Sequence, residues 1–214
     1  MSLLLAVSSA HAIPRAPVRL MLAGLYMEPN GPDAQDYGTG HFGVSASLIA
    51  PVSQKIHWLA GVAGADFVSL LDKTKDLRDS ETGLRVEQVT SQTYFRFFLG
   101  GQIGGHARGF LRPHAGFNVA LIVYGYSTDV VVPDDYNTEQ EIRQNLESEH
   151  HVTVGQDINL GLDFRLSRRM DLDLGVRYLK SLGVEQNMGR DLVTVYPEYA
   201  QVYLGIGFSF GTTE

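Results

Sequence analysis

Eight segments of this chain alternate between apolar and polar residues at every second position, which is the pattern of a β-strand with two different faces. They cover approximately residues 17–27, 39–50, 56–70, 91–104, 113–126, 152–166, 170–182 and 199–210. Strands of soluble proteins usually have about five or six residues, whereas a tilted strand that crosses a bilayer needs about nine to eleven. The number and length of the segments therefore predict an all-β protein with strands long enough to span a membrane.

The two faces of these segments differ in size as well as in polarity. In residues 152–166 one face carries Val154, Ile158, Leu160, Leu162, Phe164 and Leu166, and the other carries Asp157, Asn159, Gly161, Asp163 and Arg165. The bulky apolar face favours contact with lipid, and the glycine-rich, charged face suits a narrow barrel interior. The strands of a soluble sandwich or lipocalin-like barrel also alternate between apolar and polar residues. Periodicity alone therefore does not show which face points inward. In residues 56–70 the assignment is ambiguous, because Trp58 and Asp66 have the same parity.

Short and long connections between the segments alternate strictly. The short ones lie around Ser53–Lys55, His106–Arg112 and Ser167–Arg169, and the long polar ones cover 28–38, 71–90, 127–151 and 183–198. This order predicts an eight-stranded antiparallel up-and-down transmembrane β-barrel with all short turns at one end. Within the third long connection, Thr138–Glu149 has a cap-like threonine and an acidic first turn, which predicts a short helix.

Composition excludes several other classes of protein. The formal net charge of −7 disfavours nucleic-acid binding, and the absence of cysteine excludes disulfides and thiolate metal sites. Residues 1–12, MSLLLAVSSAHA, combine a short apolar run with an A-x-A pattern at Ala10–Ala12. We interpret them as a truncated signal peptide, with the barrel domain covering 13–214.

Three stretches resemble a known family: GLDFRLSRRMDLDLGVRY (161–178), LRPHAGFNVAL (111–121) and the last strand YAQVYLGIGFSF (199–210). The chain resembles the eight-stranded outer-membrane β-barrels of the OmpA/OmpX-like kind, over nearly all of 13–214. The resemblance implies a place in the outer membrane of a Gram-negative envelope, with termini and short turns periplasmic and long loops extracellular. It also implies contact with outer-membrane lipids and lipopolysaccharide, recognition of the last strand by the barrel assembly machinery, and a monomer. The chain departs from the family pattern by continuing beyond Phe210 with Gly-Thr-Thr-Glu.

The polar face supplies the main candidate site. Its members are Arg19, Arg96, Gln102, Asn118, Asp157, Asp163, Arg165, Asp171, Asp173 and Arg177. An eight-stranded barrel has room inside only for side chains, and charges in so narrow a space must be paired. We therefore expect Arg96, Asp157, Asp163, Arg165, Asp171, Asp173 and Arg177 to form an ionic network that fills the lumen. A narrow polar pore is the alternative.

The hairpin around Ser167–Arg169 has two possible registers that keep its charges inside. A turn centred on Arg168 places Arg165 opposite Asp171 and Asp163 opposite Asp173. A turn centred on Arg169 places Arg165 opposite Asp173 and Asp163 opposite Gly175. We predict the second register, because it avoids a pair of like charges.

No credible catalytic, cofactor or metal site emerges from the sequence. Some barrels of this kind modify lipid A with a Ser/His/acid set, but His41 and Ser45 lie four residues apart on one strand, roughly 13 Å. That distance is too long for a nucleophile and its base. Adjacent His150 and His151 point to opposite faces of a strand. The sequence therefore favours a non-enzymatic structural or surface-interaction protein, whose acidic loops (72–87 and 129–149) meet the outside.

Overall fold

The computed structural model describes residues 18–31, 40–53, 56–78, 85–104, 109–132, 142–188 and 191–210. The strands are β1 (Val18–Pro29), β2 (His41–Ser53), β3 (Ile56–Arg78), β4 (Arg85–Gly104), β5 (Leu111–Val132), β6 (Ile142–Arg165), β7 (Met170–Ser181), β8 (Val184–Met188), β9 (Asp191–Val195) and β10 (Glu198–Phe210). Among these residues, no helix has the length and hydropathy needed to cross a membrane. The predicted signal peptide, residues 1–12, lies outside the described residues.

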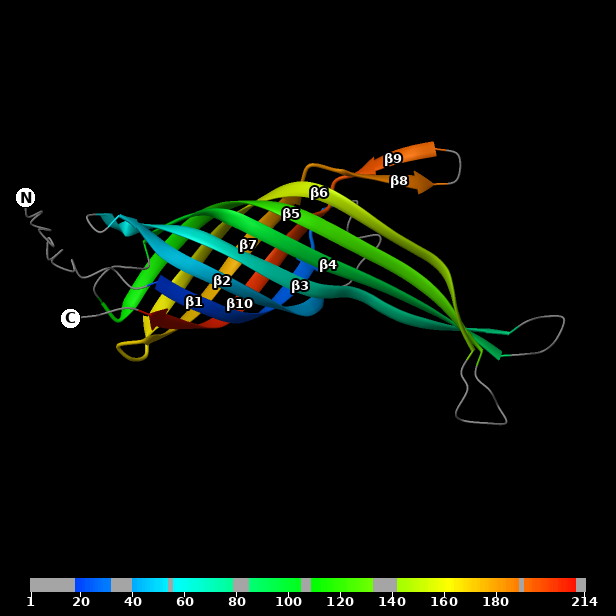
Figure 1. Cartoon of the computed structure of the whole chain (residues 1–214), viewed down its shortest axis with the longest axis horizontal. Coiled ribbons are helices and arrows are strands. Elements are labelled where there is room, and N and C mark those ends of the chain that lie inside the picture. Colours follow the sequence, from blue (N-terminus) through cyan, green and yellow to red (C-terminus); the bar gives the residue numbers. More distant parts are fainter. Residues whose placement is uncertain are drawn as a thin grey trace, which may run out of the picture.

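Eight of the strands close into an antiparallel barrel in the order β1-β10-β7-β6-β5-β4-β3-β2 (Figure 1). The strands β1 to β7 pair in chain order, β7 pairs with β10, and β1 closes the ring against β10, with Val18 opposite Phe210. The start of β1, the end of β10 and the turn between β6 and β7 lie at the same end of the barrel, here called the turn end. The predicted eight-stranded up-and-down topology is confirmed.

The barrel is apolar outside and polar inside, the reverse of a soluble protein. Along β10, Val202, Leu204 and Ile206 are exposed, and the alternate residues Gln201 and Tyr203 are buried. Large exposed apolar side chains occur on every strand of the ring. A continuous apolar belt of this kind is stable only against lipid. The apolar face predicted from the sequence is thus the outer face of a transmembrane barrel.

The turn between β6 and β7 has the register that we did not predict. Arg165 lies opposite Asp171 and Asp163 opposite Asp173. The backbone NH groups of Arg169 and Met170 donate to the hydroxyl of Ser167, over 3.2 and 3.1 Å, and Leu166 N donates to Met170 O over 3.0 Å. The serine therefore stabilises a turn centred on Arg168. The predicted centre at Arg169 is wrong.

Four strands are much longer than the sequence pattern indicated. β3, β4, β5 and β6 contain 23, 20, 22 and 24 residues, and their outer parts project beyond the ring as a four-stranded sheet (Figure 1). Much of the loops predicted at 71–90 and 127–151 is therefore strand. The helix predicted over Thr138–Glu149 is wrong where it is described, because Ile142–Glu149 belongs to β6 and pairs with β5. Tertiary pairing outweighs a weak helical signal here.

The connection between β7 and β10, predicted as a long loop, contains a small hairpin of β8 and β9 (Figure 1). Ser181 N donates to Pro197 O over 3.1 Å, which holds the base of this connection together. Gly183, between β7 and β8, has a φ of 127°, a backbone conformation that residues with a Cβ rarely adopt. Glycine thus permits the chain to leave the barrel wall abruptly at this point.

Candidate functional site in the barrel interior

Four charged side chains meet at the centre of the lumen, and we call them the central cluster: Asp66 (β3), Arg96 (β4), Asp157 (β6) and Arg177 (β7). Arg96 Nε lies 3.3 Å from Asp66 Oδ2 and its Nη2 lies 3.1 Å from Asp157 Oδ2. Arg177 Nη1 lies 2.9 Å from Asp66 Oδ2, and its Nε lies 3.6 Å from Asp157 Oδ1. Each arginine thus contacts both aspartates, and two positive charges balance two negative ones.

Neighbouring side chains hold the central cluster in place. Asn118 donates to Asp157 Oδ1 over 2.8 Å, and Arg177 Nη1 donates to the side-chain oxygen of Gln201 over 3.2 Å. The guanidinium groups of Arg96 and Arg177 lie 4.3 and 5.1 Å from the centroid of the Phe98 ring. Such cation–π contacts are strongest where the cation is shielded from water. The centre of the lumen is consequently filled and fixed from several strands.

A second group of charges lies nearer the turn end, and we call it the turn-end cluster: Arg19, Arg112, His114, Asp163, Asp171 and Asp173. Arg19 Nη1 lies 2.6 Å from Asp163 Oδ1 and 3.7 Å from Asp171 Oδ2, and Arg112 Nη2 lies 2.5 Å from Asp171 Oδ1. His114 Nε2 lies 2.9 Å from Asp173 Oδ1. Three carboxylates therefore share the space with two arginines and one imidazole.

Beyond the central cluster, on the side away from the turn end, the lumen is filled by aromatic and apolar groups. Tyr94 is fully buried, and its ring centroid lies 5.5 Å from that of Tyr124 and 5.9 Å from that of Tyr199. Met27, Val68 and Leu179 belong to the same buried cluster. The interior is therefore layered, with charges toward the turn end and tyrosines toward the projecting sheet.

The structure brings six of the seven residues predicted for the ionic network into these two clusters. Arg96, Asp157 and Arg177 lie in the central cluster, and Asp163, Asp171 and Asp173 lie in the turn-end cluster. Arg165 does not join them: it is exposed, and its Nε donates to Ser167 O over 3.3 Å. Its cross-strand neighbour Asp171 instead contacts Arg112 and Arg19.

Four members of the two clusters are absent from the predicted network: Arg19, which the sequence places on the polar face, and Asp66, Arg112 and His114. Arg112 and His114 share the parity of buried Asn118 on β5, so the alternation itself could have identified them. Asp66 was left ambiguous because Trp58 has the same parity. The structure resolves this conflict: Asp66 is 1% exposed and Trp58, near the turn end, is 59% exposed. A side chain at the barrel end can be exposed even where its parity is that of the lumen residues.

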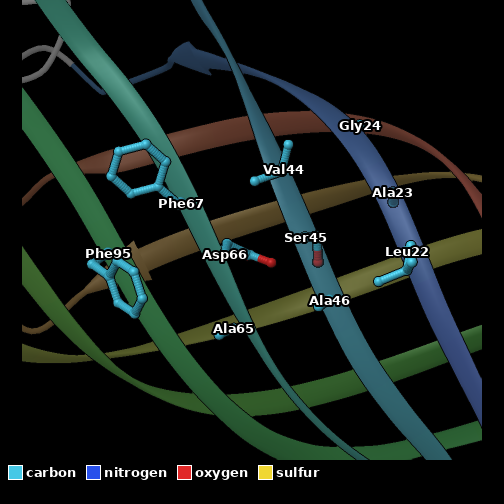
Figure 2. Close-up of a pocket in the computed structure, with 10 residues that line it drawn as sticks. All are labelled: Leu22, Ala23, Gly24, Val44, Ser45, Ala46, Ala65, Asp66, Phe67 and Phe95. Atoms are coloured by element: carbon cyan, nitrogen blue, oxygen red, sulfur yellow. The ribbon is translucent and has the colours of Figure 1, made fainter.

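The outer wall carries a shallow hollow where β1, β2, β3 and β4 lie side by side (Figure 2). It is lined by Leu22, Ala23, Gly24, Val44, Ser45, Ala46, Ala65, Asp66, Phe67 and Phe95. The small residues Gly24, Ala46 and Ala65 face outward between larger apolar neighbours. The hollow is thus a dip in the apolar belt that lipid chains can fill.

Comparison with known proteins points to the same architecture. No family model and no curated protein sequence matches the chain. Among solved structures, Neisserial surface protein A (NspA) has a TM-score of 0.58 at 10% identity, covering 90% of this chain and 97% of that one. A major outer membrane protein from Thermus thermophilus has a TM-score of 0.51 at 13% identity, covering 90% of this chain and 99% of that one. The protein is therefore an eight-stranded transmembrane β-barrel with the fold of the outer-membrane barrel proteins.

Proposed function

We propose that this protein is a non-enzymatic surface-interaction barrel of the outer membrane, which binds extended segments of other proteins along the edge of its projecting sheet. The short turns then face the periplasm and the projecting sheet faces the outside. Lipids and lipopolysaccharide surround the apolar belt, the assembly machinery inserts the barrel, and the protein acts as a monomer. The observation that carries the proposal is the open edge of β6.

The open edge of β6 exists because β6 is longer than β7, its neighbour in the ring. β6 begins at Ile142, but its pairing with β7 begins only at Gly155. Among the described residues, 142–153 of β6 therefore have a ladder partner in β5 alone, and the edge ends at Thr153, whose hydroxyl donates to Gly183 O over 2.7 Å. On the other side of the sheet, β3 continues beyond the last residue paired with β2, Val68. Unpaired edges are templates for adding a strand from another chain.

The backbone direction along the β6 edge follows from one hydrogen bond. Leu182 N donates to Val154 O over 2.8 Å, so the backbone groups of Val154 point toward β7. Alternate residues of a strand point their backbone groups to the same side. Ser148, His150 and Val152 consequently direct their NH and CO groups away from β5, toward the open edge.

Charge indicates the kind of segment that would add to this edge. Residues 127–151 contain seven acidic residues and one arginine. A basic, extended segment is therefore favoured by attraction to these carboxylates, and the attraction weakens as salt screens it. Residues 71–90, which include the β3 edge, are nearly balanced, with five acidic and four basic residues. The β6 edge should therefore prefer basic segments more strongly than the β3 edge does.

A labelled peptide of alternating lysine and threonine tests the proposal. We expect fluorescence anisotropy to show binding to the refolded barrel and at least about a tenfold loss of affinity in the His150→Pro variant. Proline there removes an NH that points to the open edge and leaves the β5–β6 ladder intact. His150→Ala, which keeps the backbone NH, is the matched control and should bind like the wild type.

Two outcomes would contradict edge pairing. One is equal binding of the peptide to the wild type and His150→Pro. The other is equal binding of a peptide whose alternate amides are N-methylated, since methylation removes the donors but keeps the charge. Either result would mean that the peptide is held by charge alone.

Conductance addresses the pore alternative. Arg96 and Tyr94 are fully buried in the lumen, and the charged side chains of the central cluster form ion pairs with one another. We therefore expect purified protein in a planar bilayer to show no stable ohmic current, because an eight-stranded barrel filled with side chains has no water column. Steady single-channel currents that disappear after heat unfolding would establish a pore instead.

A further inference from the structure

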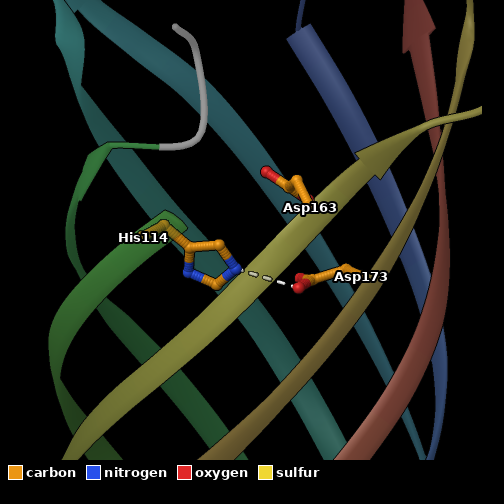
Figure 3. Close-up of side chains that lie close together, drawn as sticks. All are labelled: His114, Asp163 and Asp173. Atoms are coloured by element: carbon orange, nitrogen blue, oxygen red, sulfur yellow. Dashed lines mark hydrogen bonds and ion pairs between the residues drawn. The ribbon is translucent and has the colours of Figure 1, made fainter. Parts of the chain in front are cut away.

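We propose that His114, Asp163 and Asp173 form a binding site for one divalent transition-metal ion of the zinc class, inside the barrel. Each residue offers one ligand atom, and the three atoms lie within 4.8 Å of one another. All three side chains are buried. Figure 3 shows the imidazole directed at Asp173, with Asp163 on the neighbouring strand. This inference does not depend on the proposed function.

The register of three adjacent strands builds the triad. Asp163 on β6 and Asp173 on β7 are directly opposite each other, and His114 on β5 is opposite Gly161. A Cβ on Gly161 would lie only 2.5 Å from both Cε1 and Nε2 of His114. The absence of a side chain at Gly161 therefore leaves the space into which the imidazole extends across β6 toward Asp173.

One buried carboxylate oxygen of the triad lacks a hydrogen-bond partner among the described residues. Asp163 Oδ1 contacts Arg19, but Asp163 Oδ2 has no hydrogen-bond partner among the described residues. Asp163 is 0% exposed and Asp173 is 3% exposed, so water screens their repulsion poorly. Arg112 lies against Asp171 rather than against these two carboxylates. A divalent cation between them offsets both charges and supplies the partner missing at Oδ2.

The donor set selects the class of ion. One imidazole nitrogen and two carboxylate oxygens suit zinc and neighbouring transition metals, whereas calcium and magnesium prefer oxygen ligands alone. In a tetrahedral site with ligand atoms about 2.0–2.2 Å from the ion, those atoms lie roughly 3.3–3.6 Å apart. The three atoms of the triad, which lie within 4.8 Å of one another, must therefore approach by up to about 1.5 Å, a movement that the side chains share. Arg19, which contacts Asp163 through Oδ1, would orient the carboxylate from outside the coordination sphere.

The test uses the full chain refolded in detergent micelles, with folding of each variant checked by heat-modifiable migration on a gel. We expect calorimetric titration with zinc chloride to show one site per barrel. His114→Gln and Asp173→Asn should weaken the affinity by more than about a hundredfold, since losing even an outer-sphere partner costs about ten- to a hundredfold. Histidine–carboxylate ligation should also appear in X-ray absorption of the zinc-bound wild type, which requires no variant.

The exposed pair His151 and Glu149, 3.0 Å apart, provides the matched control. His151→Ala should bind zinc like the wild type. The proposal is overturned if the wild type binds no zinc at millimolar concentration, or if His114→Gln binds as tightly as the wild type. It is equally overturned if His151→Ala abolishes binding, because the ion would then lie on the projecting sheet.

Discussion

Replacing Arg96 with alanine should lower the free energy of unfolding by about 3–5 kcal/mol. Arg96 is fully buried and contacts both aspartates of the central cluster. Its loss leaves Asp66 and Asp157 with only Arg177 to balance two negative charges out of reach of water. Urea unfolding of the protein refolded into lipid vesicles measures the difference.

The control for this result is Arg165→Ala. Arg165 is exposed near the turn, so its removal should change the free energy of unfolding by no more than about 0.5 kcal/mol. The double variant Arg96→Met with Asp157→Asn removes one positive and one negative charge from the central cluster. It should therefore be more stable than Arg96→Ala. If Arg96→Ala and Arg165→Ala were equally stable, the central cluster would contribute nothing to stability.

Arginine in place of Leu174 should destabilise the barrel by about 2–4 kcal/mol. Leu174 lies on the outer face of β7 between Leu162 of β6 and Leu204 of β10, and all three are exposed. A charged group at this position would lie in hydrocarbon. The same urea titration in vesicles measures the effect.

Leu182→Arg is the matched control for the lipid face. Leu182 is 68% exposed and lies just beyond the end of β7, where a charge near the interface costs about 1 kcal/mol or less. Equal costs at Leu174 and Leu182 would argue that the apolar belt does not sit in the hydrocarbon zone. A large loss of stability in Leu174→Arg, with little loss in Leu182→Arg, would show that the apolar belt lies in the hydrocarbon zone.

The fold was predictable because two faces of each strand have opposite chemical requirements. Alternation of residues such as Asp163 and Leu162 places one in the lumen and the other against lipid, and this determines the strand count and topology. The projecting sheet was not predictable in the same way. In the projecting part of β6, the neighbouring polar residues Gln144 and Asn145 are both exposed, so the strict apolar–polar alternation is lost and the sequence resembles a loop.

The candidate site was predictable in its residue types but not in its pairing. Parity identifies Arg96, Asp157 and Arg177 as lumen residues, yet which aspartate meets which arginine depends on how far each strand is staggered around the ring. The hairpin register was mispredicted for a related reason. Repulsion between Asp163 and Asp173 disfavours the observed register when only β6 and β7 are considered, but Arg19 and His114 approach these carboxylates from other strands. Ser167, which stabilises the observed turn, was the better local signal.

The closure between β1 and β10 has a consequence for assembly. Every other seam of the ring joins strands that follow each other along the chain, with only the β8–β9 hairpin intervening between β7 and β10. The last seam joins residues from opposite ends of the described chain, with Val18 beside Phe210. The hairpins can therefore form one after another, but the lumen charges are sealed from water only when the first and last strands meet. Closure of the ring therefore requires a long-range contact between β1 and β10, and each of these strands has an unpaired edge until the two meet.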